Sequence, residues 1–101
     1  MNLDLKNINE AFENKVRLGI MSALMVNEEL DFSSLKSLLE LTDGNLASHT
    51  RSLEEMGYIQ SKKQFVGRKP NTTYAITPEG RVAFTDHLNA LESFLRNSMR
   101  K

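Results

Sequence analysis

The sequence has 101 residues and no cysteine. Without cysteine the chain has neither disulfides nor thiolate metal sites, a composition that fits a reducing compartment such as the cytoplasm. Histidine is scarce as well. The two histidines, His49 and His87, cannot supply a zinc site made of histidine and cysteine ligands. We therefore expect a protein that uses no metal and no other cofactor.

Long apolar runs are also missing, and no stretch is suited to crossing a membrane. The first ten residues, MNLDLKNINE, lack the basic and then apolar layout of a signal peptide. A chain of this length has room for one domain with a modest core. We expect a cytoplasmic protein with no membrane partner, folded as one domain over residues 1–101.

Net charge is the next feature that is lacking, because 13 basic side chains balance 13 acidic ones. A neutral chain argues weakly against nucleic-acid binding, but the distribution of charge matters more, because the positive charge is concentrated. Residues 61–75 contain Lys62, Lys63, Arg68 and Lys69 and no acidic residue. A local patch of this kind can attract phosphate even when the whole molecule is neutral.

The most informative stretch is an amphipathic helix expected over residues 43–56, with Thr42 or Asp43 as its cap. One stripe of this helix carries Leu46, Thr50 and Leu53 and should face the core. The opposite side is short and hydrogen-bonding, a character suited to close approach and to reading donors and acceptors in a DNA major groove about 12 Å wide. The alternative is an ordinary solvated helix face. The outer candidates are Gly44, Asn45, Ser48, His49 and Arg51.

Two further helices are expected before this one, over residues 8–28 and 33–40. A short helix, a tight turn and a second helix with a small polar outer face form the layout of a helix-turn-helix. In that layout the second helix enters the major groove. We call the helix at 43–56 the recognition helix.

A hairpin is expected over residues 58–76, since turn residues at 67–71 separate two β-rich segments. Arg68 and Lys69 at its tip are candidates for a minor groove or a phosphate, although a basic loop tip can also serve solubility alone. Lys62 and Lys63 point to opposite sides of their strand, so at most one should face DNA, and we assign Lys62.

The last helix is expected over residues 78–97, with Thr77 as its cap and Pro78 in its first turn. Its apolar stripe is too long for a domain of this size to cover easily. We expect the stripe to pair with its copy in a homodimer, the alternative being that the helix folds back on its own core. The interface candidates are Phe84, Leu88, Leu91 and Leu95.

These segments, in this order and spacing, resemble the small winged-helix transcriptional regulators of the MarR/ArsR type. The matching pieces lie at 31–33, 43–49, 53–59, 65–70, 73–74 and 77–81. The resemblance implies a mainly α (α+β) winged helix-turn-helix with a C-terminal dimerisation helix. It also implies that the recognition helix lies in the major groove and the hairpin, or wing, lies along the backbone or minor groove. The DNA-facing residues carried over are Asn45, Ser48, His49, Arg51, Arg68 and Lys69.

The chain departs from the family pattern at two points. Leucine is commoner at the inward slot of Thr50, where a buried hydroxyl can bond a backbone carbonyl one turn earlier. The cysteines with which arsenic-type regulators sense metal are missing, so metal sensing is not carried over.

We expect a sequence-specific regulator of transcription, acting as a repressor, whose partner is double-stranded DNA with a pseudo-palindromic site. An enzyme is not expected, because Ser48 and His49 are adjacent on a helix and point about 100° apart, and no phosphate-binding glycine loop is present. The alternative is a winged helix used for protein contact, which Glu54 and Glu55 would suit. A small-molecule effector could bind between the recognition domain and the dimer helices, but no polar cluster marks such a site.

Overall fold

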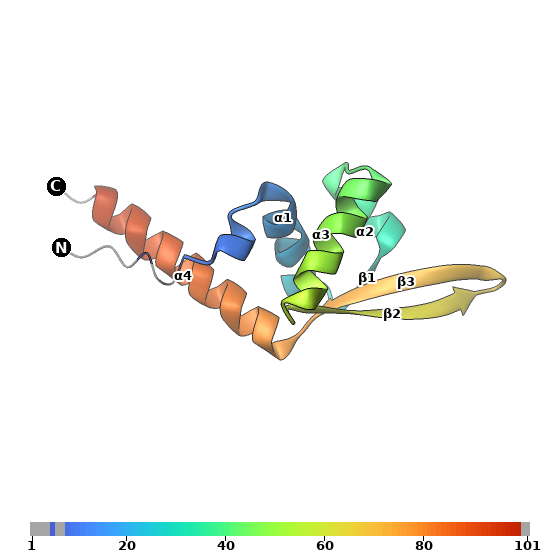
Figure 1. Ribbon diagram of the computed structural model, residues 1–101. Helices are drawn as coiled ribbons and strands as arrows, with labels where there is room; N and C mark the ends of the chain where they lie inside the picture. The colour runs from blue at the N-terminus through green and yellow to red at the C-terminus, as the bar shows by residue number, and fades with distance from the viewer. Residues whose placement is uncertain (1–4, 6–7, 100–101) are drawn as a thin grey trace.

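The computed structural model describes residue 5 and residues 8–99, and it is a winged helix with four α-helices and a small antiparallel sheet (Figure 1). The strand order in the sheet is β1-β3-β2. In chain order the elements are η2 (Glu10–Phe12), α1 (Lys15–Met25), β1 (Leu30–Asp31), α2 (Phe32–Leu39), α3 (Asp43–Glu55), β2 (Ile59–Val66), β3 (Lys69–Ile76) and α4 (Pro78–Met99).

The long first helix expected at 8–28 is wrong in extent, because two asparagines interrupt it. The side chain of Asn9 accepts from the Ala11 amide at 2.9 Å and caps the short turn η2. The side chain of Asn14 accepts from the Val16 amide at 2.9 Å and opens α1. Asparagine at such positions bonds the backbone locally and so favours a fresh helix start over a continuous helix. The remaining boundaries agree with expectation to within a few residues.

The core lies between α1, α2, α3 and the base of the sheet. Leu24 of α1, Leu35 of α2 and Leu46 of α3 have no exposed surface, and Tyr74 of β3 closes the core from the sheet side. Burial of such side chains contributes about 1.5–3 kcal/mol each. These contacts hold α2 and α3 in a fixed relation to the wing, the hairpin formed by β2 and β3.

An aromatic cluster joins the N-terminal turn to the last helix. The ring of Phe12 packs edge-on against Phe84 of α4, with centroids 5.1 Å apart, and lies 5.2 Å from the ring of Tyr58. His87, also on α4, lies 5.4 Å from Phe12, and its Nδ1 accepts from the Asn9 amide at 2.9 Å. Since η2 precedes α1 and Tyr58 follows α3, the cluster fixes α4 against both.

The junction between wing and last helix is tight. The Thr77 hydroxyl donates to the Gly57 carbonyl at 2.6 Å and accepts from the Gly80 amide at 2.9 Å. A Cβ at Gly80 would lie 2.0 Å from the Tyr58 carbonyl oxygen, a distance that only glycine avoids. The absence of a side chain at Gly80 therefore lets α4 start directly beside the end of α3.

The first half of α4 belongs to the core, and this corrects the expectation for Phe84. The Phe84 side chain is 1% exposed within its own chain, so it is not available to a second chain. The second half of α4 projects away from the body, at the end opposite the wing tip (Figure 1). The radius of gyration is 15.5 Å, whereas a compact domain of this length has about 13 Å. The excess reflects these two projections.

His87 makes stability depend on pH. Burial lowers the pKa of His87, and a weaker attraction to Glu13 opposes this. The unfolded chain therefore takes up the proton more readily than the folded one. We expect the free energy of unfolding to be highest above about pH 6.5 and to fall as the pH drops from there through the lowered folded pKa.

Urea unfolding of wild type and His87→Gln between pH 7.5 and 5.5 measures this effect. The decline should be smaller in the variant, because glutamine does not titrate. Equal declines in the two proteins would mean that His87 plays no part.

Candidate nucleic-acid interface

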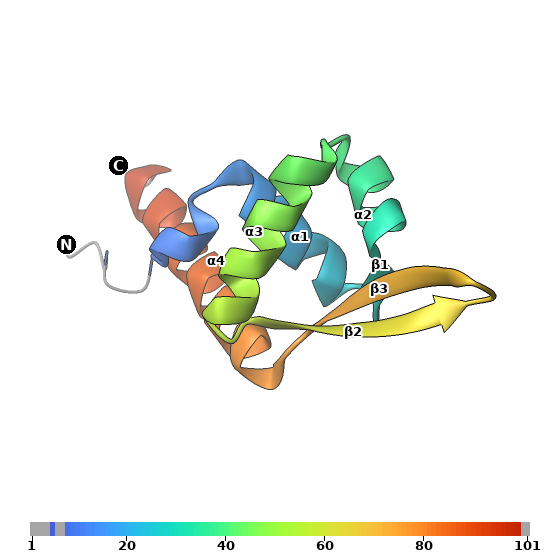
Figure 2. The ribbon, with the colours of Figure 1, turned by 45° about the vertical axis from the view of Figure 1, so that its right-hand side comes forward.

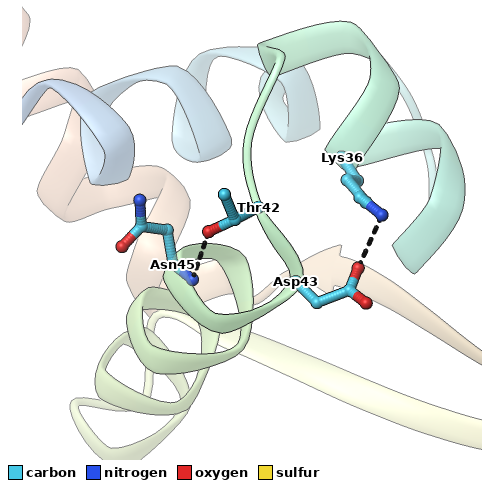
Figure 3. Close-up of polar contacts among 4 residues, drawn as sticks. All are labelled: Lys36, Thr42, Asp43 and Asn45. Atoms are coloured by element: carbon cyan, nitrogen blue, oxygen red, sulfur yellow. Dashed lines mark hydrogen bonds and ion pairs between the residues drawn. The ribbon is translucent and has the colours of Figure 1, made fainter.

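The start of α3 is defined by its own side chains (Figure 3). Thr42 caps the helix, since its Oγ1 accepts from the Asn45 amide at 3.2 Å. Asp43 lies beside Lys36 of α2, with Nζ and Oδ1 2.8 Å apart. Both partners are well exposed, so the ion pair contributes little to stability. It does link α2 to the first residue of α3 and neutralises a carboxylate that would otherwise repel phosphate.

The inward stripe of α3 is as expected. Leu46, Thr50 and Leu53 are buried, and the hydroxyl of Thr50 donates to the Leu46 carbonyl at 2.9 Å. This is the bond to the preceding turn that the sequence suggested, and it leaves no buried polar atom unsatisfied at Thr50. With this stripe fixed, the opposite face of the helix points to solvent.

That outer face brings four of the expected residues together. Gly44, Asn45, Ser48 and Arg51 are all exposed. A Cβ built on Gly44 would meet nothing within 4 Å, so no contact inside the chain requires glycine there. Together the four make a low surface that offers hydrogen-bond donors and acceptors over the first two turns of the helix. Such a surface can reach base edges in a major groove.

His49 differs from the other four because it lies on the flank of α3 that faces α1. Its side chain is half-buried, and its Nδ1 lies 3.2 Å from Nη1 of Arg17. Burial lowers the pKa of His49, and the neighbouring Arg17 charge lowers it further. The imidazole is therefore neutral around pH 7, with one of its nitrogens engaged within the chain.

The wing is a regular hairpin with a two-residue turn. Val66 pairs with Lys69 in the register, so Gly67 and Arg68 form the turn. Gly67 has a φ of 66° and Arg68 does not share a positive φ. Glycine at the first position is typical of the type II′ turn that suits the twist of a hairpin. Arg68 and Lys69 are thereby held in and beside the turn of the wing, and both are exposed. Figure 2 shows this turn at the end of the hairpin that points away from the helices.

The register also decides which lysine of β2 faces α3. Ser61 points to α3, since its hydroxyl donates to Glu54 Oε2 at 3.0 Å. Alternation places Lys63 on the same face, and Lys63 lines a groove with Arg51 between α3 and the wing. Lys62 lies on the other face, near Glu29. The structure therefore does not bring Lys62 to the recognition-helix side, and Lys63 replaces it.

Sequence reasoning missed three features of this surface. Lys63 was passed over because alternation along a strand does not show which of its two faces meets the recognition helix. Phe65 shares the face of Lys63 and is 74% exposed near the wing tip. The third feature is the approach of Arg17 to His49, which no sequence signal indicated.

Comparison with known proteins gives consistent results. A model described as a winged helix DNA-binding domain matches residues 16–95. An uncharacterized protein of Methanocaldococcus jannaschii, MJ0432, is 37% identical over 86 residues, which cover 85% of this chain and 94% of the relative.

Among solved structures, the transcriptional regulator homologue from Pyrococcus horikoshii OT3 superposes with a TM-score of 0.86 at 34% identity, covering 95% of this chain and 97% of that one. The ArsR family regulator RHA00566 has a TM-score of 0.62 at 24% identity over 96% of this chain and 93% of its own, a likeness of fold alone. The expected likeness to winged-helix regulators of MarR/ArsR type is confirmed.

None of the helices in the described part of the chain has the length and apolarity needed to cross a membrane.

The two neighbouring lysines of β2 make a matched pair for testing which face meets nucleic acid. We expect Lys63→Ala to make the plot of log affinity against log salt shallower by about 0.9 for each protomer bound, or about 1.8 for a dimer, because each copy loses one phosphate contact. Lys62→Ala should leave the slope unchanged. Fluorescence anisotropy with a labelled duplex measures both. A larger change for Lys62 than for Lys63 would contradict the assignment of faces.

Proposed function

This chain belongs to the winged helix DNA-binding domain family, and from that membership we propose that it regulates transcription by binding a pseudo-palindromic DNA site as a homodimer. The family and the similar solved structures are those of DNA-binding regulators and not of enzymes. The sequence specificity, the dimer and a repressing role are the parts proposed here.

The observation that carries the proposal is the pairing of two surfaces on one side of the molecule. The outer face of α3 is exposed and hydrogen-bonding, and the wing beside it carries exposed basic side chains. In the major groove, Asn45 is suited to an adenine edge and Arg51 to guanine or a phosphate. Ser48 lies between them and is suited to hydrogen bonds with either adenine or guanine.

The wing supplies contacts of a different kind. Arg68 at the turn is suited to a narrow minor groove, and Lys69 and Lys63 are suited to phosphate oxygens. Such contacts attract any sequence, since they involve the DNA backbone and shape. Affinity thus comes mainly from the wing and base selection from α3, a division that is open to test by substitution.

A homodimer is supported by the second half of α4. Leu88 and Leu95 are exposed there and Leu91 is half-buried, at spacings that place all three on one stripe. A second copy of this stripe would cover them by two-fold symmetry. Two recognition helices would then lie roughly 34 Å apart, one DNA turn, and read a pseudo-palindrome. The dimer would repress transcription if its site overlaps the site where polymerase binds. Both would be in the cytoplasm.

A second candidate function is protein contact through the same fold. Glu54 and Glu55 are exposed at the end of α3, and carboxylates there would repel DNA that approached that end of the helix. A basic partner protein would suit them. The wing favours DNA, because Lys63, Arg68 and Lys69 would repel such a partner.

Substitutions in α3 and the wing should separate the two kinds of contact. Arg68→Ala should weaken binding to all sequences alike, whereas Asn45→Ala should change the preferred sequence, with a loss of about 1–3 kcal/mol of discrimination at one base pair per half-site. Site selection from a random pool, run with each variant, measures both effects. Equal loss of discrimination from the two variants would refute the division of roles.

The dimer has its own matched pair of variants on α4. Leu95 is 59% exposed on the proposed stripe, and Val82 is 62% exposed on the other side of the helix. Leu95→Lys should raise the dimer dissociation constant by at least about tenfold, since burial of a leucine contributes about 1.5–3 kcal/mol and a two-fold dimer buries two. Val82→Lys should leave it unchanged. Sedimentation equilibrium measures the dissociation constant of each protein. A wild type that is monomeric at micromolar concentration would rule out the dimer.

A further inference from the structure

The Arg17 side chain connects three elements next to the recognition helix. It extends from α1, and its Nε donates to the Ala11 carbonyl of η2 at 2.6 Å. Its Nη1 lies 3.2 Å from Nδ1 of His49 on α3. The guanidinium is thus held from one side by the backbone of η2 and is directed at one nitrogen of the imidazole.

The direction of that hydrogen bond is fixed by chemistry. A guanidinium has only donors and stays protonated in proteins, so Nη1 must donate and Nδ1 must accept. An imidazole nitrogen that accepts carries no proton. The proton of neutral His49 is therefore on Nε2, which leaves His49 with a donor and no free acceptor.

The Nε2 of His49 is accessible from outside. None of the described residues forms a hydrogen bond with Nε2 of His49. Among the described residues that are not exposed, every side-chain nitrogen or oxygen that is fully buried has a hydrogen-bond partner. An unpaired Nε2 must then contact solvent. His49 lies one helical turn after Asn45, on the flank adjacent to the exposed outer face. The imidazole of His49 therefore borders the outer face of α3.

We propose that Arg17 is a positioning residue that fixes His49 as a pure hydrogen-bond donor toward DNA. The inference rests on the proposed function and deepens it by naming the class of atom that His49 recognises. The acceptors available are N7 and O6 of guanine, N7 of adenine and O4 of thymine, or a phosphate oxygen. The amino groups of adenine and cytosine are excluded, because His49 has no free acceptor to offer them.

The charge near His49 reinforces this arrangement. From α1 the positive Arg17 faces the imidazole and disfavours a second positive charge, in the same direction as burial. No acidic side chain of the described residues offsets it at His49. Burial and Arg17 both lower the pKa of His49, so His49 should stay a neutral donor to a lower pH than free histidine does.

Arginine is needed because the two bonds point in different directions. Its planar group presents Nε to the Ala11 carbonyl and Nη1 to His49 at the same time. A lysine carries a single nitrogen on a flexible stem and is not held in one plane. Arg17→Lys should therefore reproduce the charge but not the fixed tautomer.

The first test needs only the wild-type protein without DNA. Long-range proton–nitrogen correlation spectra of the histidine rings distinguish the two neutral tautomers. We expect His49 to carry its proton on Nε2 at pH 7. His87 is an internal reference for the same tautomer, since its Nδ1 accepts from the Asn9 amide. A proton on Nδ1 of His49, or a mixture of tautomers, would overturn the proposal.

Substitution then tests the cause. In Arg17→Met, His49 should become a mixture of tautomers with its pKa raised toward the ordinary value, while the signals of His87 stay unchanged. The unchanged His87 would also show that the variant is folded. If His49 keeps the Nε2 proton in the variant, Arg17 does not position it and the inference is wrong.

DNA binding distinguishes this inference from the proposed function. On a selected site we expect Arg17→Met to weaken binding about threefold to tenfold, the value of one hydrogen bond, with the base preference relaxed at one position per half-site. Uniform weakening in a variant whose His49 keeps the Nε2 proton would mean that Arg17 touches phosphate itself, and would overturn the positioning role. Uniform weakening together with mixed tautomers would mean that the acceptor of His49 is a phosphate oxygen. A wild type that binds no DNA would end the proposed function, whereas the tautomer result would stand.

Discussion

The burial of one stripe of α3 is the constraint on which the rest of the molecule depends. Leu46, Thr50 and Leu53 are held against α1, α2 and the sheet, and the Thr50 hydroxyl is satisfied within the helix. Rotation of α3 about its axis would expose these side chains, so the orientation of the opposite face is fixed by the core. The small polar residues of that face need no support of their own. A surface that is prepared in advance loses little conformational entropy on binding.

The two halves of α4 likewise have separate roles, because only the first half packs in the core. Phe84 and His87 tie the first half of the helix to Phe12 and so to the body, which frees the second half to project. The projecting half is what a second copy of the chain would cover. If it does, the rigid path from α3 through Tyr58 and the aromatic cluster to α4 sets the separation of the two recognition helices. Half-site spacing would then be a property of the core packing.

Much of this was readable from the sequence, and the failures have physical reasons. The α3 boundaries, the wing and the inward Thr50 follow from local chemistry: caps, turn residues and periodicity. Phe84 was misassigned because a stripe on a 22-residue helix runs from core to solvent, and periodicity alone does not tell where the body ends. Lys62 was chosen over Lys63 because alternation shows that two neighbours face apart and not which way. The contact of Arg17 with His49 joins residues far apart in the chain, so no local sequence pattern predicts it.

The most direct test of the central claim is the affinity of the wild-type protein for a mixed-sequence duplex, measured by fluorescence anisotropy at low and at physiological salt. Arg51, Lys63, Arg68 and Lys69 lie on or beside the proposed surface. If Lys63 and Lys69 touch phosphate in both halves of a dimer, log affinity should fall against log salt with a slope of about −4, and with a slope of roughly −7 if Arg51 and Arg68 also do so. Binding that weakens this steeply is what the account predicts. No binding at low salt, or binding that salt leaves unchanged, would contradict it.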